Sequence, residues 1–212
     1  PVTATDDVYT GGGSAAATIT ALSGGNFENL VASSAPATTT LTDDADATTV
    51  SLSATPSVAE GGSIVYTAAL TNPTDTAMSV TLSNGAVINI AAGASTGSVS
   101  VAAPTDDVYL DAGSVSATIA STSGGNFEAL VVSPTAATTP VSDTLDTVTA
   151  TLTASAGVVE GGAITYTVSL PSPVTGSAVS VTLSNGATIS IPVGASRGTA
   201  TVTATDAVYT AA

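Results

Sequence analysis

Carboxylates are the side chains with which this chain could do chemistry. It carries 16 Asp and Glu residues against a single base, Arg197, and it contains neither His nor Cys. Disulfides are therefore excluded, and so are zinc, copper and iron sites built from nitrogen or sulfur ligands. Catalytic triads and thiol chemistry lose their central residues as well. Two uses of carboxylates remain open: acid–base chemistry between paired carboxyl groups, and binding of a hard cation by oxygen ligands.

The carboxylates recur in register at a spacing of about 100 residues. Thirteen of the 16 acids have an acidic counterpart in another copy: Asp6/Asp106/Asp206, Asp7/Asp107, Glu28/Glu128, Asp43/Asp143, Asp46/Asp146 and Glu60/Glu160. Asp44, Asp75 and Asp111 have none. Nearly all of these acids lie in segments with turn character, whereas a chain that needed charge only for solubility would mix both signs over its exposed faces. The sequence therefore concentrates one sign of charge at a few points.

The uncharged residues repeat with the same period. The motif DDVY at 6–9 returns at 106–109 and in part, as DAVY, at 206–209. The motif SGGNFE at 23–28 returns unchanged at 123–128. A fixed period of this kind is typical of a tandem array of structural repeats.

Acidic segments mark the boundaries between the repeats. TDDAD at 42–46 and SDTLD at 142–146 each follow the last expected strand of a copy. We therefore expect three parts: the C-terminal part of one repeat at 1–46, a complete repeat at 47–146, and the N-terminal part of the next at 147–212. Because the chain begins with Pro, we also expect it to belong to a longer protein.

Within one period the pattern is that of β-strands throughout. Apolar residues alternate with Ser and Thr, as in half-buried antiparallel strands, and no segment has helical periodicity. Seven strands are expected in the complete repeat: 48–54, 63–70, 77–83, 86–90, 96–103, 113–121, and 127–133 with an extension toward 142. Asn84-Gly85 predicts a two-residue hairpin between two of them. The fold class predicted is all-β, with tandem immunoglobulin-like β-sandwich domains of about 100 residues per repeat. Tyr109 is then either a tyrosine corner or an ordinary half-buried tyrosine.

In such a sandwich, the loops after the first, third and fifth strands share one pole with the linker to the next repeat. Six carboxylates from these segments should therefore meet there: Glu60, Asp106, Asp107, Asp111, Asp143 and Asp146. With no opposite charge nearby they would repel one another. Calcium removes this repulsion, because it takes roughly 6–8 oxygen ligands in irregular geometry, and Gly61 and Gly62 would let the backbone bend close to the ion.

The sequence therefore predicts calcium sites, with solvated acidic loops as the alternative. The counterparts in the other copies are candidate ligands on the same ground: Asp6, Asp7, Asp43, Asp46, Glu160 and Asp206. Glu128 lies at the opposite pole. It either completes a junction site from the following repeat or is an exposed strand residue.

The charge balance also restricts the partners. Nucleic acids and anionic membrane surfaces are excluded, because both need clustered Lys and Arg. No apolar run reaches membrane-spanning length, so direct membrane insertion is not expected either. The expected partners are neighbouring repeats of the same polypeptide, and end-to-end self-association of identical copies is left open. The thin aliphatic core, with two Phe and no Trp, suggests that each domain needs additional stabilisation.

Four segments carry a resemblance to a known family. VAEGGSIVYTAALTNP, VTLSNGAVINIAAGAS, DDVYLDAGSVSATI and SGGNFEALVV resemble the extender repeats of giant bacterial RTX adhesins, among them the LapA-type biofilm adhesins and a long ice-binding adhesin. The resemblance implies calcium-rigidified modules strung between a cell-surface anchor and a distal binding tip, secreted by a type I system. It assigns the ligand role best to Glu60/Glu160, Asp106/Asp107 and Asp143/Asp146. Ala207 departs from the DDVY pattern, which weakens the assignment at the last junction.

The function predicted is that of a non-catalytic extender module of a large secreted adhesin at the bacterial cell surface. It would project a distal adhesive domain for surface attachment or biofilm formation. The alternatives are a carbohydrate- or protein-binding immunoglobulin-like module and a subunit of an extracellular filament. An enzyme is not expected, because the carboxylates fall at domain junctions and not in a cleft.

Overall fold

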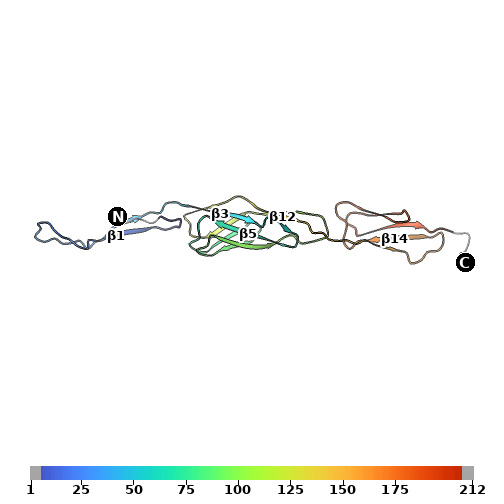
Figure 1. Cartoon of the computed structure of the whole chain (residues 1–212), viewed down its shortest axis with the longest axis horizontal. Coiled ribbons are helices and arrows are strands. Elements are labelled where there is room, and N and C mark those ends of the chain that lie inside the picture. Colours follow the sequence, from blue (N-terminus) through green and yellow to red (C-terminus); the bar gives the residue numbers. More distant parts are fainter. Residues whose placement is uncertain (1–5, 207–212) are drawn as a thin grey trace. The chain divides into compact units, whose positions relative to one another are not determined.

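The chain folds into β-strands alone. The computed structural model describes residues 6–206, and within them every regular element is a strand (Figure 1). Residues 207–209 of the DAVY motif lie outside this range. No helix in the described range is long and apolar enough to cross a membrane. The predicted all-β class is thus confirmed. The chain divides into two compact units, Pro1–Thr105 with Gly113–Ser142, and Asp106–Ala112 with Asp143–Ala212.

The complete repeat builds three small sheets. The first orders β11 (Ala129–Val132), β3 (Ala47–Ala54), β5 (Ser63–Leu70) and β8 (Thr96–Ala102). The second orders β10 (Ile119–Gly124), β6 (Met78–Leu82) and β7 (Val87–Ile90), and the third orders β4 (Val58–Ala59), β12 (Ala137–Ser142) and β9 (Gly113–Ala117). The first five predicted strands are found within one residue of their expected bounds, because alternation with period two is a direct consequence of strand geometry.

The last two predicted strands each divide into two, which the sequence analysis did not expect. β9 pairs with β12, whereas β10 pairs with β6, and the register shifts between Ile119 and Ser121. β11 runs parallel to β3, and β12 runs parallel to β4. Alternating Ser and Thr look the same on both sides of such a break. Residues 113–142 therefore pair with all three sheets and hold them together.

The hairpin at Asn84-Gly85 is in the predicted place, but the prediction of a two-residue loop was wrong. The carbonyl of Leu82 accepts a hydrogen bond from the N–H of Gly85, and the N–H of Leu82 donates to the carbonyl of Ala86. The loop therefore has three residues. Gly85 has φ of 84°, whereas Asn84 keeps an ordinary negative φ, and a two-residue type I′ turn would require positive φ at both.

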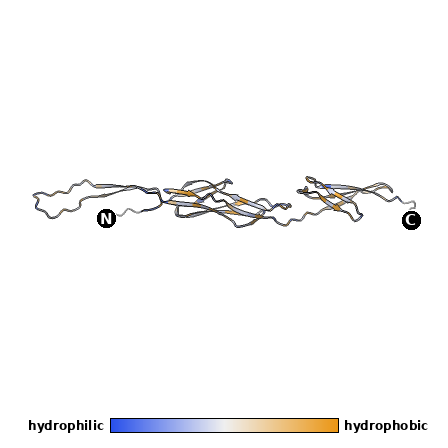
Figure 2. Cartoon of the chain, turned by 90° about the horizontal axis from the view of Figure 1, so that it is seen from above, coloured by the Kyte–Doolittle hydropathy of each residue, from blue (hydrophilic) through white to orange (hydrophobic). Residues whose placement is uncertain are grey.

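The core of the complete repeat is aliphatic and contains one tyrosine. Val50, Ile64, Tyr66, Val80 and Ile88 are all fully buried, and hydrophobic residues (orange in Figure 2) lie along the strands of this repeat. The hydroxyl of Tyr66 is buried without a hydrogen-bond partner, and burial raises its pKa. An unsatisfied buried hydroxyl of this kind costs about 1–3 kcal/mol. This core therefore stabilises the fold less than its apolar content suggests.

Parts of two further repeats flank the complete one. In the N-terminal segment, β1 (Gly13–Ala17) pairs with β2 (Ala37–Leu41), in the register that β9 and β12 use. In the C-terminal unit, one sheet orders β13 (Thr151–Ala154), β14 (Ala163–Ser169) and β17 (Arg197–Thr203), and the other pairs β15 (Val179–Thr182) with β16 (Thr188–Ile191). Its core is smaller, built on Val168, Val174, Ile189 and Ile191.

Candidate metal centre

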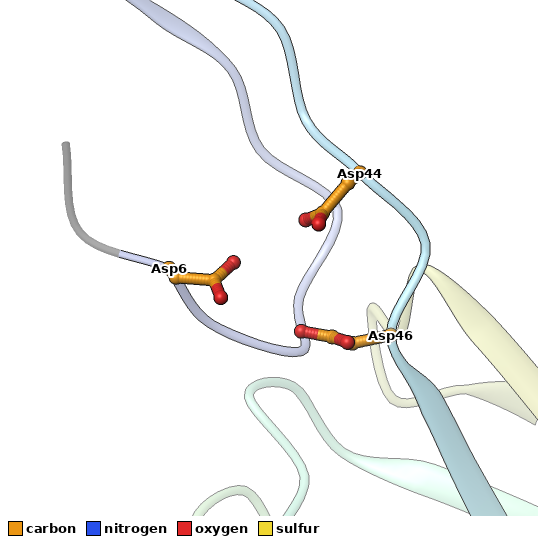
Figure 3. Close-up of side chains that lie close together, drawn as sticks. All are labelled: Asp6, Asp44 and Asp46. Atoms are coloured by element: carbon orange, nitrogen blue, oxygen red, sulfur yellow. The ribbon is translucent and has the colours of Figure 1, made fainter.

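Three carboxylates converge where the N-terminal segment meets the complete repeat. One carboxylate oxygen from each of Asp6, Asp44 and Asp46 lies within 4.8 Å of the other two, and Figure 3 shows the three side chains pointing into one space. Asp6 precedes β1, whereas Asp44 and Asp46 belong to the linker between β2 and β3. The negative charges of Asp44 and then Asp46 raise the pKa of Asp6. The cluster therefore resists full ionisation when nothing neutralises it.

A polar cavity of 580 Å³ adjoins the cluster. It is lined by Asp6, Asp7 and Tyr9 of the loop 6–9, which we call the acidic loop, by Gly11 to Gly13, and by residues 41–44 at the start of the linker. Asp43 accepts a hydrogen bond from the N–H of Gly11 at 2.7 Å, which ties the linker to the start of β1. Asp7 accepts one from the N–H of Tyr9 at 2.9 Å, so its carboxylate closes the loop on itself.

Glu128 approaches the same linker from the following repeat. One of its carboxylate oxygens, Oε2, accepts a hydrogen bond from the N–H of Asp46 at 2.6 Å. The other, Oε1, is buried without a hydrogen-bond partner. The Asp46 N–H lowers the pKa of Glu128, but burial, the side chain and charge of Asp43 and the charge of Asp46 together raise it by more. Of the two interpretations left open for Glu128, this contact with the acidic linker favours the first.

These oxygens suit a hard cation. All the oxygens come from carboxylates on three separate segments, and one of these oxygens is buried without a partner. Like charge raises the pKa of Asp6, and burial together with like charge raises the pKa of Glu128. The single base, Arg197, belongs to the other compact unit. Ca²⁺ tolerates an irregular carboxylate set of this kind, whereas Mg²⁺ demands near-ideal octahedral geometry.

The predicted ligands fall into several places. Asp6 and Asp46 belong to the cluster, Asp43 lies beside it, and Asp7 serves the Tyr9 backbone. Asp44, the third member, was not among the predicted ligands. At its counterpart position Thr144 donates a hydrogen bond to the carboxylate of Asp106. The only signal for Asp44 was its position between two recurring acids.

Glu60 lies in the turn between β4 and β5 and is 8% exposed. Its N–H donates to the carbonyl of Ser142, and that of Gly61 donates to the carbonyl of Pro104. Its counterpart Glu160 is exposed. The turn that carries Glu160 lies close to Asp206, because a Cβ built on the neighbouring Gly161 would be 3.7 Å from the Cβ of Asp206. The remaining predicted ligands belong to the second compact unit: Asp106, Asp107, Asp111, Asp143 and Asp146.

A tyrosine from the acidic loop contacts the next repeat. The hydroxyl of Tyr9 donates to the carbonyl of Pro73 at 2.8 Å. Its ring stacks on Phe127, with centroids 5.9 Å apart, and the N–H of Glu128 donates to the carbonyl of Val8 at 3.1 Å. We call this set of contacts the tyrosine clasp. It holds the loop that carries Asp6 against the repeat that carries Glu128.

The hydroxyl contact of the clasp is repeated in the second compact unit. The hydroxyl of Tyr109 donates to the carbonyl of Pro173 at 2.8 Å, and its N–H donates to Asp107 at 2.7 Å. Tyr109 is therefore not a tyrosine corner, whose hydroxyl would bond a few residues upstream. Its partner lies 64 residues downstream. A half-buried tyrosine was expected as the alternative, but its contact was not.

Replacing Tyr9 with Phe should destabilise the chain by about 0.5–1.5 kcal/mol, because one hydrogen bond is lost while the ring can still stack. Tyr66→Phe is the matched control. It removes a hydroxyl that has no partner, so its free energy of unfolding should stay the same or rise. Urea unfolding of both variants in chelator measures this difference. An equal loss in both would show that the Tyr9 hydroxyl contributes nothing specific.

Without metal, the free energy of unfolding should fall as pH rises from mildly acidic to neutral. The folded-state pKa values of Asp6 and Glu128 are raised above their ordinary values of 3.8 and 4.5. Between the ordinary and the raised values the folded chain holds more protons than the unfolded chain, so stability is lost as pH rises through the folded-state values. Urea unfolding at a series of pH values in chelator tests this. Asp44→Asn should flatten the profile, and a stability that climbs with pH would overturn the expectation.

The fold and the acidic cluster together define a class of protein, in which all-β repeats follow one another in tandem with acidic segments at their junctions. The LapA domain model matches residues 1–44, 46–144 and 146–212, and the chain therefore belongs to the LapA domain family. No curated protein matches the chain. A solved structure that resembles it is the crystal structure of a two-domain protein of unknown function from Bacteroides fragilis NCTC 9343. That match has 9% sequence identity and a TM-score of 0.34, and it covers 71% of this chain and 87% of that chain.

The family gives the coarse function. LapA domains belong to biofilm adhesins, a non-enzymatic class of protein located at the cell surface or outside the cell. The chain is thus related to biofilm adhesins, and the family to which it belongs is not enzymatic.

Proposed function

We propose that the chain is an extender: a run of immunoglobulin-like repeats whose junctions bind calcium and which projects a distal adhesive domain from the cell surface. The observation that carries this proposal is the double use of the DDVY loop. Its tyrosine contacts the following repeat, and its first aspartate joins an acidic cluster with the linker. A loop built in this way serves the connection between repeats, which a spacer needs and an isolated binding module does not.

Calcium would be held by Asp6, Asp44 and Asp46, with Glu128 facing the linker from the following repeat. When bound, the ion would neutralise carboxylates that otherwise repel one another and would cross-link segments on both sides of the junction. The chain's own part is to bring these oxygens together. The tyrosine clasp holds the loop that carries Asp6 against the following repeat. The hydrogen bond from the Gly11 N–H to Asp43 fixes the linker beside β1, and the hydrogen bond from the Asp46 N–H orients the carboxylate of Glu128.

A carbohydrate-binding role has less support. Sugar sites use exposed aromatic side chains with converging polar groups. Tyr66 is buried in the core, and Tyr9, Tyr109 and Phe127 are engaged in the contacts described above. Phe27, in the partial N-terminal repeat, is 70% exposed, whereas its counterpart Phe127 in the complete repeat is half-buried against Tyr9.

The extender role can be tested by separating the distance that the repeats span from any ligand binding of their own. Repeats of this sequence would be placed between a membrane anchor and a distal domain of known ligand, and displayed on cells with a thick surface polymer. Adhesion to the ligand should increase with repeat number, and repeats displayed without the distal domain should not adhere. A glycan array probed with the purified chain provides the control. Reproducible, specific hits would favour a binding module over a spacer.

A further inference from the structure

The first and the last strands of the complete repeat run parallel to each other. β11 pairs with β3 over four residues, and β12 pairs with β4 over two. The other strand pairs of this repeat are antiparallel. The segment 47–59, with which the repeat begins, therefore lies beside the segment 129–142, with which it ends, and both point in the same direction. We call these two segments the terminal pair.

The direction of the terminal pair decides how tension acts on it. In a parallel pair, the start of one strand and the end of the other lie at opposite ends. The polypeptide enters the repeat at residue 47 and leaves it at residue 142. Tension along the chain therefore pulls the two segments past each other lengthwise and loads all the hydrogen bonds between them at the same time. In an antiparallel pair the same tension would break these bonds one after another.

The hydrogen bonds within the terminal pair continue beyond the two short ladders. The hydroxyl of Thr139 donates to the carbonyl of Thr55 at 2.7 Å, in the gap between β3 and β4. The N–H of Glu60, just after β4, donates to the carbonyl of Ser142 at 3.0 Å. The two segments are thus connected over nearly their whole length.

The inner side of the terminal pair is buried. Val50, Thr48 and Thr139 are fully buried, and Ala137 and Val141 are 6% and 5% exposed. Both segments contribute to this buried side, so lengthwise sliding would disrupt core packing together with the hydrogen bonds. Close-packed interiors do not deform gradually. The terminal pair should therefore hold until all these contacts break together.

We propose that the complete repeat bears tension and that the terminal pair is the element that resists it. The origin of the force rests on the proposed extender function, because a spacer between an anchor and a bound tip is pulled at both ends. The resistance itself follows from the direction and contacts of the strands and requires no metal. Forced unfolding is governed by the rate of unfolding. That rate should depend on the bonds within the terminal pair more than on the total stability of the repeat.

Pulling the chain in two directions tests the proposal. The chain has no Cys, so introduced cysteines define where it is held. Ala45→Cys with Leu145→Cys flanks the repeat and loads the terminal pair lengthwise. Ala59→Cys with Leu145→Cys places both attachments at one end of the terminal pair and opens it from there. All three positions are exposed. In optical tweezers, the 212-residue chain should unfold at a severalfold higher force in the first direction, and equal forces would overturn the proposal.

Two isosteric substitutions separate mechanical resistance from stability. Thr139→Val removes the hydrogen bond to Thr55. Thr74→Val is the matched control, because Thr74 is 1% exposed and donates to the carbonyl of Ala91 at 2.8 Å, outside the terminal pair. Both should lower stability in urea by similar amounts. At constant lengthwise force, Thr139→Val should raise the unfolding rate by about tenfold, and Thr74→Val should leave it unchanged. Equal acceleration by both would overturn the proposal.

The pulling experiments are made in chelator, so their outcome does not depend on the proposed calcium sites. A calcium effect missing from thermal unfolding would contradict the proposed junctions and leave the lengthwise unfolding force as it is. Equal forces in the two pulling directions would contradict the role of the terminal pair alone. The two failures are therefore distinguishable.

Discussion

Calcium should raise the temperature of thermal unfolding, and a chelator should leave a loosened chain. A ligand that binds only the folded state at a concentration of 100 times its dissociation constant stabilises it by about 2.7 kcal/mol. In a chain of this size that corresponds to a shift of about 5–10 °C. The ion is expected to act this strongly because the core is thin and because the cluster of Asp6, Asp44 and Asp46 has no base beside it within its own compact unit.

The variant Asp44→Asn should have two effects that a merely destabilising substitution would not combine. Removing one of three mutually repelling carboxylates should stabilise the metal-free chain, and removing a ligand should reduce the shift that calcium produces. Asp75→Asn is the control. Asp75 also lacks an acidic counterpart, but its carboxylate accepts a hydrogen bond from the Asn126 side chain and lies outside the cluster. Identical melting curves of the parent in calcium and in chelator would rule out the calcium proposal.

The sequence predicts the strands of this chain well and their pairing less well. Alternation fixes where β3, β5 and β8 begin and end, because side chains on opposite faces of a strand meet different environments. It cannot show that residues 113–124 change sheets near Thr118, because Ser and Thr alternate on both sides of the break. The register shift between Ile119 and Ser121 depends on packing between distant strands.

Only part of the acidic site could be predicted from the sequence, and the reason is related. Recurrence singled out Asp6 and Asp46, since each copy of the repeat needs its own ligands. The same filter removed Asp44, because Thr144 occupies the next copy. Recurrence also marked Tyr9 and Tyr109 as a pair without revealing their role. Their partners, Pro73 and Pro173, lie in the following repeat, and a contact across a junction leaves no local pattern in the sequence.

The second large effect concerns the stiffness of a longer array. A small contact between domains normally permits relative motion, so the clasp alone should leave some freedom at each junction. Ions that cross-link the DDVY loop, the linker and the following repeat should remove that freedom. Small-angle scattering on polypeptides of increasing repeat number should therefore show a maximum dimension that grows almost linearly in calcium, and more slowly in chelator.

Two variants distinguish the contributions of ion and clasp to that stiffness. Asp44→Asn, repeated at each junction, should give in calcium the shorter dimensions that the parent gives in chelator. Tyr9→Phe, likewise repeated, should shorten the parent in chelator more than in calcium, because the bound ion then still connects the two sides. Bent, widely distributed shapes that persist at saturating calcium would mean that the ions stabilise domains without orienting them. Extension would then have to come from repulsion between like-charged repeats, and added monovalent salt would shorten the array in calcium and chelator alike.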